Sequence, residues 1–238
     1  MILKRKIYKK LLEWKKECRG KKALLIEGAR RIGKSTICEE FGKSEYKSFL
    51  LIDFAKKDKE VEGYFEKYLN DLDTFFMLLQ THFGTKLTER NSLIIFDEVQ
   101  MFPQARAAIK YLVADGRYDY IETGSLISIR ENVKNIVIPS EERHINMYPL
   151  DFEEFAIALE EDLLVEYIKK CFEKREPLER SMHNQAMLLF HQYMLVGGMP
   201  MPVVTFIESK KDFTEADREK RDILKLYRET SYEKSTIN

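Results

Sequence analysis

The stretch that most constrains the fold of this chain is residues 28–35, which read Gly-Ala-Arg-Arg-Ile-Gly-Lys-Ser. It fits the pattern Gly-x-x-x-x-Gly-Lys-Ser/Thr at every required position. An apolar run at residues 23–27 precedes it, and a helical pattern over residues 34–41 follows it. A loop of this kind works between a buried strand and the start of a helix. The sequence therefore predicts a phosphate-binding loop in an α/β fold.

Each part of this loop has a physical task. Gly28 and Gly33 allow backbone conformations that point successive N–H groups at phosphate oxygens. Lys34 is expected to reach the β- and γ-phosphates, and Ser35 to offer its hydroxyl to Mg²⁺. The remaining candidate nucleotide-binding residues are Arg30, Arg31, Ile32 and Thr36. Of the two arginines, one is expected to touch phosphate and the other to face solvent or a partner.

A second motif follows about 60 residues later, where the apolar run Leu-Ile-Ile-Phe ends in Asp97 and Glu98. A strand of this kind delivers its last residues to the carboxyl edge of a parallel sheet, where ligands bind. Asp97 is expected to hold Mg²⁺ through its water shell. Glu98 is expected to orient and polarise a water molecule that attacks the γ-phosphate.

The residues around Asp97 also indicate the reaction. A GTPase is disfavoured, because Glu98-Val99-Gln100 follows Asp97 instead of x-x-Gly, and because the chain has no Asn-Lys-x-Asp element. The adjacent glutamate favours water over an acceptor hydroxyl as the nucleophile, which disfavours a small-molecule kinase. ATP and Mg²⁺ are thus the expected ligands, and ATP hydrolysis is the expected chemistry.

Several further residues are candidates for the same site. Thr123 and Ser125 follow an expected strand at residues 118–122, where a polar side chain can contact the γ-phosphate or the attacking water. A simple glycine-containing turn is the alternative, and both interpretations stay open. Arg143 is a candidate for stabilising charge in the transition state, with a plain surface arginine as the alternative. Arg106 and Arg117 are weaker candidates for that role.

Strand patterns alternate with helical patterns along the first part of the chain, which predicts a mostly parallel sheet with helices on both faces. The expected strands are residues 23–27, 49–52, 93–96, 118–122 and 144–147. Residues 151–195 look helical, interrupted only at Pro177, and residues 213–229 look helical again after a break at 197–202. We expect a P-loop NTPase core at residues 1–149 and a smaller all-helical lid from residue 150 to 238.

Charge is balanced overall, with 40 Lys and Arg against 40 Asp and Glu, so nothing in the total attracts nucleic acid. Locally, ten basic residues lie in 4–22, and seven acids with no base lie in 151–166. Solvated helix faces explain both; contacts between domains or subunits, or a basic arm on nucleic acid, are the alternatives. The three cysteines lack metal-site spacing, and no apolar run is long enough for a membrane. We therefore expect a cytoplasmic protein.

Together these motifs resemble a prokaryotic family of AAA-like ATPases. The similar stretches are residues 28–35, 95–100, 123–125, 143–155 and the Gly-Gly-Met-Pro element at 197–200. The resemblance implies an ATPase core followed by a helical lid, and an arginine that another subunit or a partner often supplies. Most members carry a longer C-terminal part, and this chain ends early in that region.

Two functions remain open at this point. In the first, the chain hydrolyses ATP. In the second, it is a nucleotide-gated interaction or signalling module with little turnover, in which ATP sets the angle between core and lid. Contact with DNA through the basic N-terminal helix is compatible with either.

Overall fold

The computed structural model describes residues 1–125 and 141–235, with side chains up to residue 228. The chain divides into two compact units. The first, the core unit, is Lys6–Met147. The second, the helical unit, combines Met1–Arg5 with the chain from Tyr148 onward. The first five residues, expected in the core, thus belong to the helical unit.

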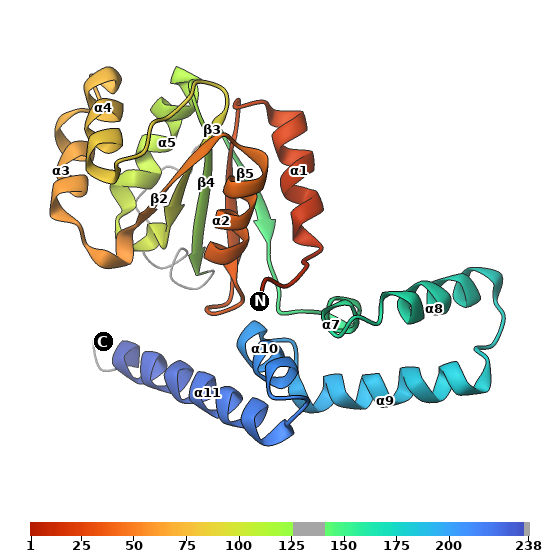
Figure 1. The fold of residues 1–238 in the computed structure, drawn as a ribbon. Helices are drawn as coiled ribbons and strands as arrows, with labels where there is room; N and C mark the ends of the chain where they lie inside the picture. The colour runs from red at the N-terminus through yellow and green to blue at the C-terminus, as the bar shows by residue number, and fades with distance from the viewer. Residues whose placement is uncertain (126–140, 236–238) are drawn as a thin grey trace. The chain divides into compact units, whose positions relative to one another are not determined.

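The described part of the core unit contains five parallel strands in the order β2-β3-β4-β1-β5 (Figure 1). The strands are β1 (Ala23–Gly28), β2 (Ser48–Asp53), β3 (Ser92–Asp97), β4 (Asp119–Ser125) and β5 (Glu142–Asn146). This confirms the predicted parallel α/β sheet. Because the strands are parallel, the ends of β1, β3 and β4 share one edge, and Gly28, Asp97 and Ser125 all lie there.

The strand β4 continues three residues beyond its predicted end. The segment Thr123-Gly124-Ser125 pairs in register with residues 26–28 of β1 and is buried. The sequence placed these residues after the strand, and this was wrong. A Thr-Gly-Ser triplet reads locally as a turn, but β1 on one side supplies hydrogen-bond partners that the local pattern cannot reveal.

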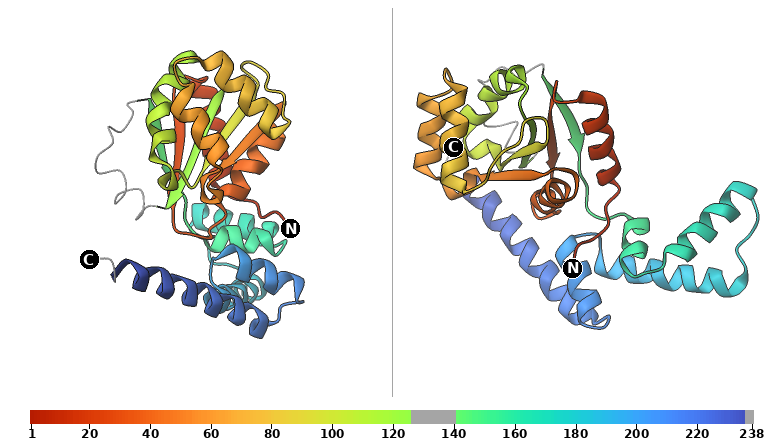
Figure 2. Two further views of the ribbon diagram at one scale, coloured as in Figure 1. Left: turned by 90° about the vertical axis from the view of Figure 1, so that its left-hand side faces the viewer. Right: turned by 45° about the horizontal axis from the view of Figure 1, so that its top comes forward.

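Helices cover both faces of the sheet (Figures 1 and 2). The helices α3 (Lys59–Lys67), α4 (Leu72–Phe83) and α5 (Pro103–Asp115) pack on one face, where Leu25, Ile52 and Phe96 join their apolar residues in a continuous core. On the other face lie α1 (Ile7–Cys18) and α2 (Lys34–Glu45). Trp14 of α1 contacts Phe41 of α2 with ring centroids 6.5 Å apart.

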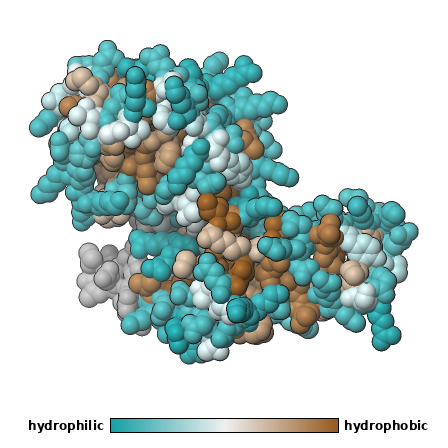
Figure 3. Space-filling model, viewed as in Figure 1, coloured by the Kyte–Doolittle hydropathy of each residue, from teal (hydrophilic) through white to brown (hydrophobic). Residues whose placement is uncertain are grey.

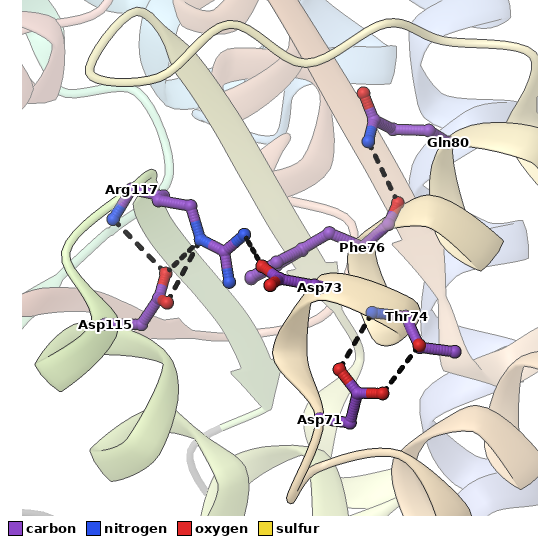
Figure 4. A network of polar contacts seen from close by, with 7 residues as sticks. All are labelled: Asp71, Asp73, Thr74, Phe76, Gln80, Asp115 and Arg117. Carbon is purple, nitrogen blue, oxygen red and sulfur yellow. Dashed lines mark hydrogen bonds and ion pairs between the residues drawn. The ribbon is translucent and has the colours of Figure 1, made fainter.

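A break separates α3 from α4, and a polar network holds this region (Figure 4). Asp71 caps α4 by accepting a hydrogen bond from the backbone N–H of Thr74 at 3.2 Å. Arg117, just before β4, bonds Asp73 of α4 at 2.6 Å and Asp115 at the end of α5 at 2.8 Å. The guanidinium also lies 4.7 Å from the centre of the Phe76 ring. Arg117 therefore ties α4 to α5.

The helical unit consists of α7 (Phe152–Ala158), α8 (Asp162–Lys174), α9 (Arg180–Val196), α10 (Pro200–Glu208) and α11 (Phe213–Ser235). The expectation that only Pro177 interrupts residues 151–195 was wrong. A second break separates α7 from α8, where Glu160 adopts a left-handed backbone with φ of 65°. The N–H groups of residues 159–161 bond back to the last turn of α7, which ends that helix.

The Gly-Gly-Met-Pro element begins α10 and packs against the start of the helical unit. The N–H of Leu150 donates to the carbonyl of Gly198 at 2.7 Å. A Cβ at position 198 would lie 2.1 Å from the Leu150 carbonyl oxygen, so only glycine fits this approach. Pro200 then occupies the first turn of α10, where its missing N–H has no helical partner to lose.

The N-terminal residues are held in the helical unit by a buried ion pair. Arg5 lies 3.3 Å from Glu154 of α7 and donates to the Tyr148 carbonyl at 2.6 Å.

The surface of the helical unit carries hydrophobic side chains among hydrophilic ones (Figure 3). Three exposed hydrophobic residues of α9 are Leu188, Met194 and Leu195. Among the described residues, no helix is long and apolar enough to cross a membrane.

Candidate nucleotide-binding site

The loop between β1 and α2 has the backbone that its sequence predicts. Gly28 packs so closely that an added Cβ would lie 2.4 Å from the Met147 carbonyl oxygen. Arg31 and Gly33 adopt left-handed conformations, with φ of 63° and 89°. Ile32 is buried and anchors the loop in the core. The loop thus turns tightly and leads into α2, whose first N–H groups carry the partial positive charge of a helix start.

Lys34 is buried inside this loop. Its ammonium group donates to the carbonyl oxygens of Gly28 at 3.2 Å and Ala29 at 2.8 Å. Burial lowers the pKa of Lys34, while the negative charges of Glu98 and Asp97 act in the opposite direction. The loop therefore encloses a cation whose hydrogen-bond partners are backbone carbonyls, and these can be exchanged for stronger anionic acceptors.

Asp97 is the point at which three elements of the core unit meet. The hydroxyl of Ser35, in the first turn of α2, lies 2.8 Å from both carboxylate oxygens of Asp97. The buried hydroxyl of Thr123, on β4, donates to the same carboxylate. Thr123 also accepts a hydrogen bond from the backbone N–H of Glu98 at 3.3 Å.

These oxygen donors suit a hard cation. No group of three or more His, Cys, Asp or Glu residues in the described ranges could hold a metal by itself. A single hydroxyl and a single carboxylate, Ser35 and Asp97, are instead the kind of set with which Mg²⁺ keeps its waters and binds phosphate oxygens. The residues present therefore fit a magnesium ion that arrives with a phosphate ligand.

Glu98 begins a short 3-10 turn, η2 (Val99–Met101), and has a left-handed backbone with φ of 55°. The amide of Gln100 donates a hydrogen bond to its carboxylate. Sequence reasoning did not single out Gln100. The signal in the sequence was a polar residue that lies between the apolar residues Val99 and Phe102. In the structure all three side chains are buried.

The other candidate residues of the loop and of β4 lie around this centre. Ser125 is buried, is the last residue of β4 and pairs in register with Gly28. Arg30 is partly exposed, whereas Arg31 and Thr36 are exposed. The structure therefore brings the candidates from β1, α2, β3 and β4 to one edge of the sheet.

The structure does not bring Arg143 to this edge. It is the second residue of β5 and pairs with Leu24, four residues before Gly28, which is about 13 Å at 3.3 Å per residue. Its guanidinium pairs with Glu17 of α1 at 2.5 Å. Within its own chain Arg143 therefore lies away from the candidate site, as the surface-arginine alternative predicts, because the first residues of a parallel strand lie at the edge opposite the phosphate loop.

Arg106 and Arg117 are also engaged elsewhere. Arg106 is buried and bonds Glu142 of β5 at 2.9 Å, and Arg117 ties α4 to α5 as described above. Beside the Arg106 pair, Glu122 of β4 is fully buried. Burial, together with the neighbouring Glu142 charge, raises the pKa of Glu122 well above its usual range, although Arg106 opposes this. Sequence reasoning also missed this buried charge cluster.

The parallel sheet, the loop between β1 and α2 and the carboxylates that end β3 define the core unit as a P-loop NTPase fold. Residues 20–156 match the model of the AAA domain family, which is more than half of the chain. The chain belongs to this family, whose members are nucleotide-binding proteins of the ATPase type. No curated protein sequence matches it.

Three solved structures are among those similar to this chain. The ORC1 protein of Aeropyrum pernix, in complex with DNA, is 10% identical with a TM-score of 0.40 over 82% of this chain and 68% of its own. Domain III of the Thermotoga maritima replication initiation protein DnaA is 14% identical, with a TM-score of 0.45 over 88% and 87%. Closed-state Hsp104, with ATPγS and FITC casein, is 15% identical, with a TM-score of 0.49 over 90% and 38%.

Proposed function

We propose that the chain binds Mg·ATP at the edge formed by β1, β3 and β4 and hydrolyses it. One observation carries this proposal. The Ser35 hydroxyl and the Asp97 carboxylate, which come from residues far apart in sequence, lie 2.8 Å apart next to the buried Lys34. Such a convergence of a hydroxyl, a carboxylate and an ammonium group at a helix start matches the needs of a magnesium-bound triphosphate.

Each residue has a separate role in this proposal. Lys34 exchanges the carbonyls of Gly28 and Ala29 for the β- and γ-phosphates, and the first N–H groups of α2 bind the same anion. Ser35 and Asp97 hold Mg²⁺, which when bound neutralises charge on the phosphate oxygens. Thr123 keeps the Asp97 carboxylate oriented by its hydrogen bond.

Glu98 acts as the base that orients and polarises the attacking water. It follows Asp97 directly, so the strand that holds the metal ligand also delivers the base. Its backbone N–H bonds Thr123, and this links the position of the base to that of the metal ligand. Lys34 and Asp97 bind the substrate in this scheme, whereas Glu98 takes part in the attack of water.

The arginine that completes the transition state comes from a second copy of the chain or from a partner protein. Support for this comes from the three arginine candidates, since Arg106, Arg117 and Arg143 are each paired with acids away from the phosphate loop. Turnover by isolated chains is then slow.

The pairing of these arginines away from the phosphate loop also favours a second candidate function. In it, the chain is a nucleotide-gated interaction module in which the helical unit acts as a lid, and the ATP-bound state rather than turnover controls a partner.

Steady-state phosphate release with Mg·ATP tests the proposal, with Glu98→Gln beside the wild type over a range of protein concentrations. Hydrolysis completed between chains predicts turnover per molecule that rises with concentration and falls at least about 10²-fold in Glu98→Gln. Tight Mg·ATP binding without phosphate release would instead favour the nucleotide-gated module. Full turnover in Glu98→Gln would refute the role of Glu98.

A further inference from the structure

We propose that Gln100 is a positioning residue that holds the carboxylate of Glu98 in the orientation needed to activate water. This inference rests on the proposed hydrolysis. Its basis is the hydrogen bond from the Gln100 side-chain amide to Oε2 of Glu98. An amide neither gives up nor takes a proton at neutral pH, so Gln100 does not itself serve as the base.

The amide of Gln100 is held rigidly. The turn η2 is closed by hydrogen bonds from the N–H of Met101 to the Glu98 carbonyl at 2.9 Å and from the N–H of Phe102 to the Val99 carbonyl at 3.2 Å. Val99 is buried in the core beneath the sheet edge, and Gln100 itself is only 3% exposed. The helix α5 begins directly afterwards at Pro103. A side chain on this support has little freedom to move away from Glu98.

Glu98 needs such a restraint. Its backbone is fixed by the left-handed conformation and by the bond from its N–H to Thr123, but three rotatable bonds separate that backbone from the carboxylate oxygens. A glutamate side chain of this kind loses rotamer freedom when it is ordered for catalysis. The Gln100 amide occupies Oε2, which directs Oε1 toward the attacking water in the proposed reaction. The restraint thus removes conformations in which the base misses its water.

The expected result of losing this bond is a slower chemical step with unchanged substrate binding. Gln100→Met keeps the length of the side chain and removes the donor. Because small misplacements of a reacting group cost up to about 10²-fold in rate, we expect kcat to fall by about 10- to 10²-fold and KM to change less than about 2-fold. Gln104→Met is the matched control, since Gln104 is exposed on α5, and it should leave both parameters unchanged.

The decisive experiment repeats Gln100→Met in a Glu98→Ala background. A positioning role requires that the second substitution changes the residual turnover by less than about 2-fold, because no carboxylate remains to be oriented. Equal fractional losses in both backgrounds, or full kcat in the single variant, would overturn the proposal. If Gln100→Met does not fold, Gln100→Asn, whose amide is one methylene too short to reach Glu98, replaces it with the same expected results.

The outcomes for Gln100 and for the proposed function can be told apart. A wild-type protein that releases no phosphate refutes hydrolysis, and the positioning role with it. A wild-type protein whose turnover depends on Glu98 but not on Gln100 refutes only the role of Gln100. Equilibrium binding of Mg·ATP, which we expect to stay within about 2-fold in Gln100→Met, separates a loss of positioning from a collapse of the site.

Discussion

Glu122 provides the sharpest test of the electrostatics of this fold. Glu122 lies on β4 and is fully buried. Its charged neighbours are Glu142 of β5 and Arg106 of α5. Burial is the main reason why its pKa is raised well above the usual value of 4.5. The folded state therefore keeps Glu122 protonated at pH values where the unfolded chain has already released that proton.

The sign of the pH dependence follows from this difference. A raised pKa in the folded state contributes stability that is present below the unfolded pKa and is lost as pH rises toward the folded pKa. Each pH unit within this window, which opens at about 4.5, costs up to about 1.4 kcal/mol of unfolding free energy. Glu122→Gln imitates the protonated form and removes this loss. At pH 7 the variant should therefore be more stable than the wild type by about 1 to 3 kcal/mol.

The measurement is urea unfolding at pH 5, 6 and 7 followed by tryptophan fluorescence. The chain has a single tryptophan, Trp14, which is 1% exposed in the core unit that also contains Glu122. His144 lies 3.2 Å from Glu142, so the relevant quantity is the difference between variant and wild type. A variant that is less stable at pH 7, with a difference independent of pH, would refute a protonated Glu122 and indicate a carboxylate held by Arg106.

Three further substitutions test other parts of the structure. Gly198→Ala forces a Cβ to within 2.1 Å of the Leu150 carbonyl oxygen and should destabilise the helical unit by about 1 to 3 kcal/mol; an unchanged thermal midpoint would disprove the close contact. Arg117→Ala removes two ion pairs and a cation–π contact and should cost about 1 to 2 kcal/mol in urea unfolding, whereas a neutral result would show that the network adds no stability. Lys34→Ala should weaken Mg·ATP binding at least about 10-fold by equilibrium titration, and unchanged affinity would contradict the phosphate-loop proposal.

The strand, loop and helix around residues 23–45 could be predicted because their requirements are local. An apolar run forms a buried strand, and glycines permit the close approach at Gly28 and the positive φ at Gly33. The same holds for the strand that ends at Asp97, since its burial follows from its composition.

Other features were decided only when strands and helices came together. Thr123 was placed after the strand, with a turn as one of two open interpretations, yet β4 continues through it and aims its hydroxyl at Asp97. Arg143 was a candidate for stabilising the transition state, with a surface arginine as the alternative, and the parallel direction of β5 puts it at the opposite edge, paired with Glu17. The bond between Gln100 and Glu98 depends on how the turn after β3 folds against the core.

The sequence alone therefore determined the phosphate-loop backbone, the acidic end of β3 and the parallel α/β class, because backbone geometry and strand burial depend on adjacent residues. Tertiary structure decided which side chains meet: the partners of Asp97 and Glu98, the burial of Glu122, and the place of Met1–Arg5 in the helical unit. The physical reason is that such contacts depend on strand order and on the edge at which each strand begins, and neither quantity is encoded in a short stretch of chain.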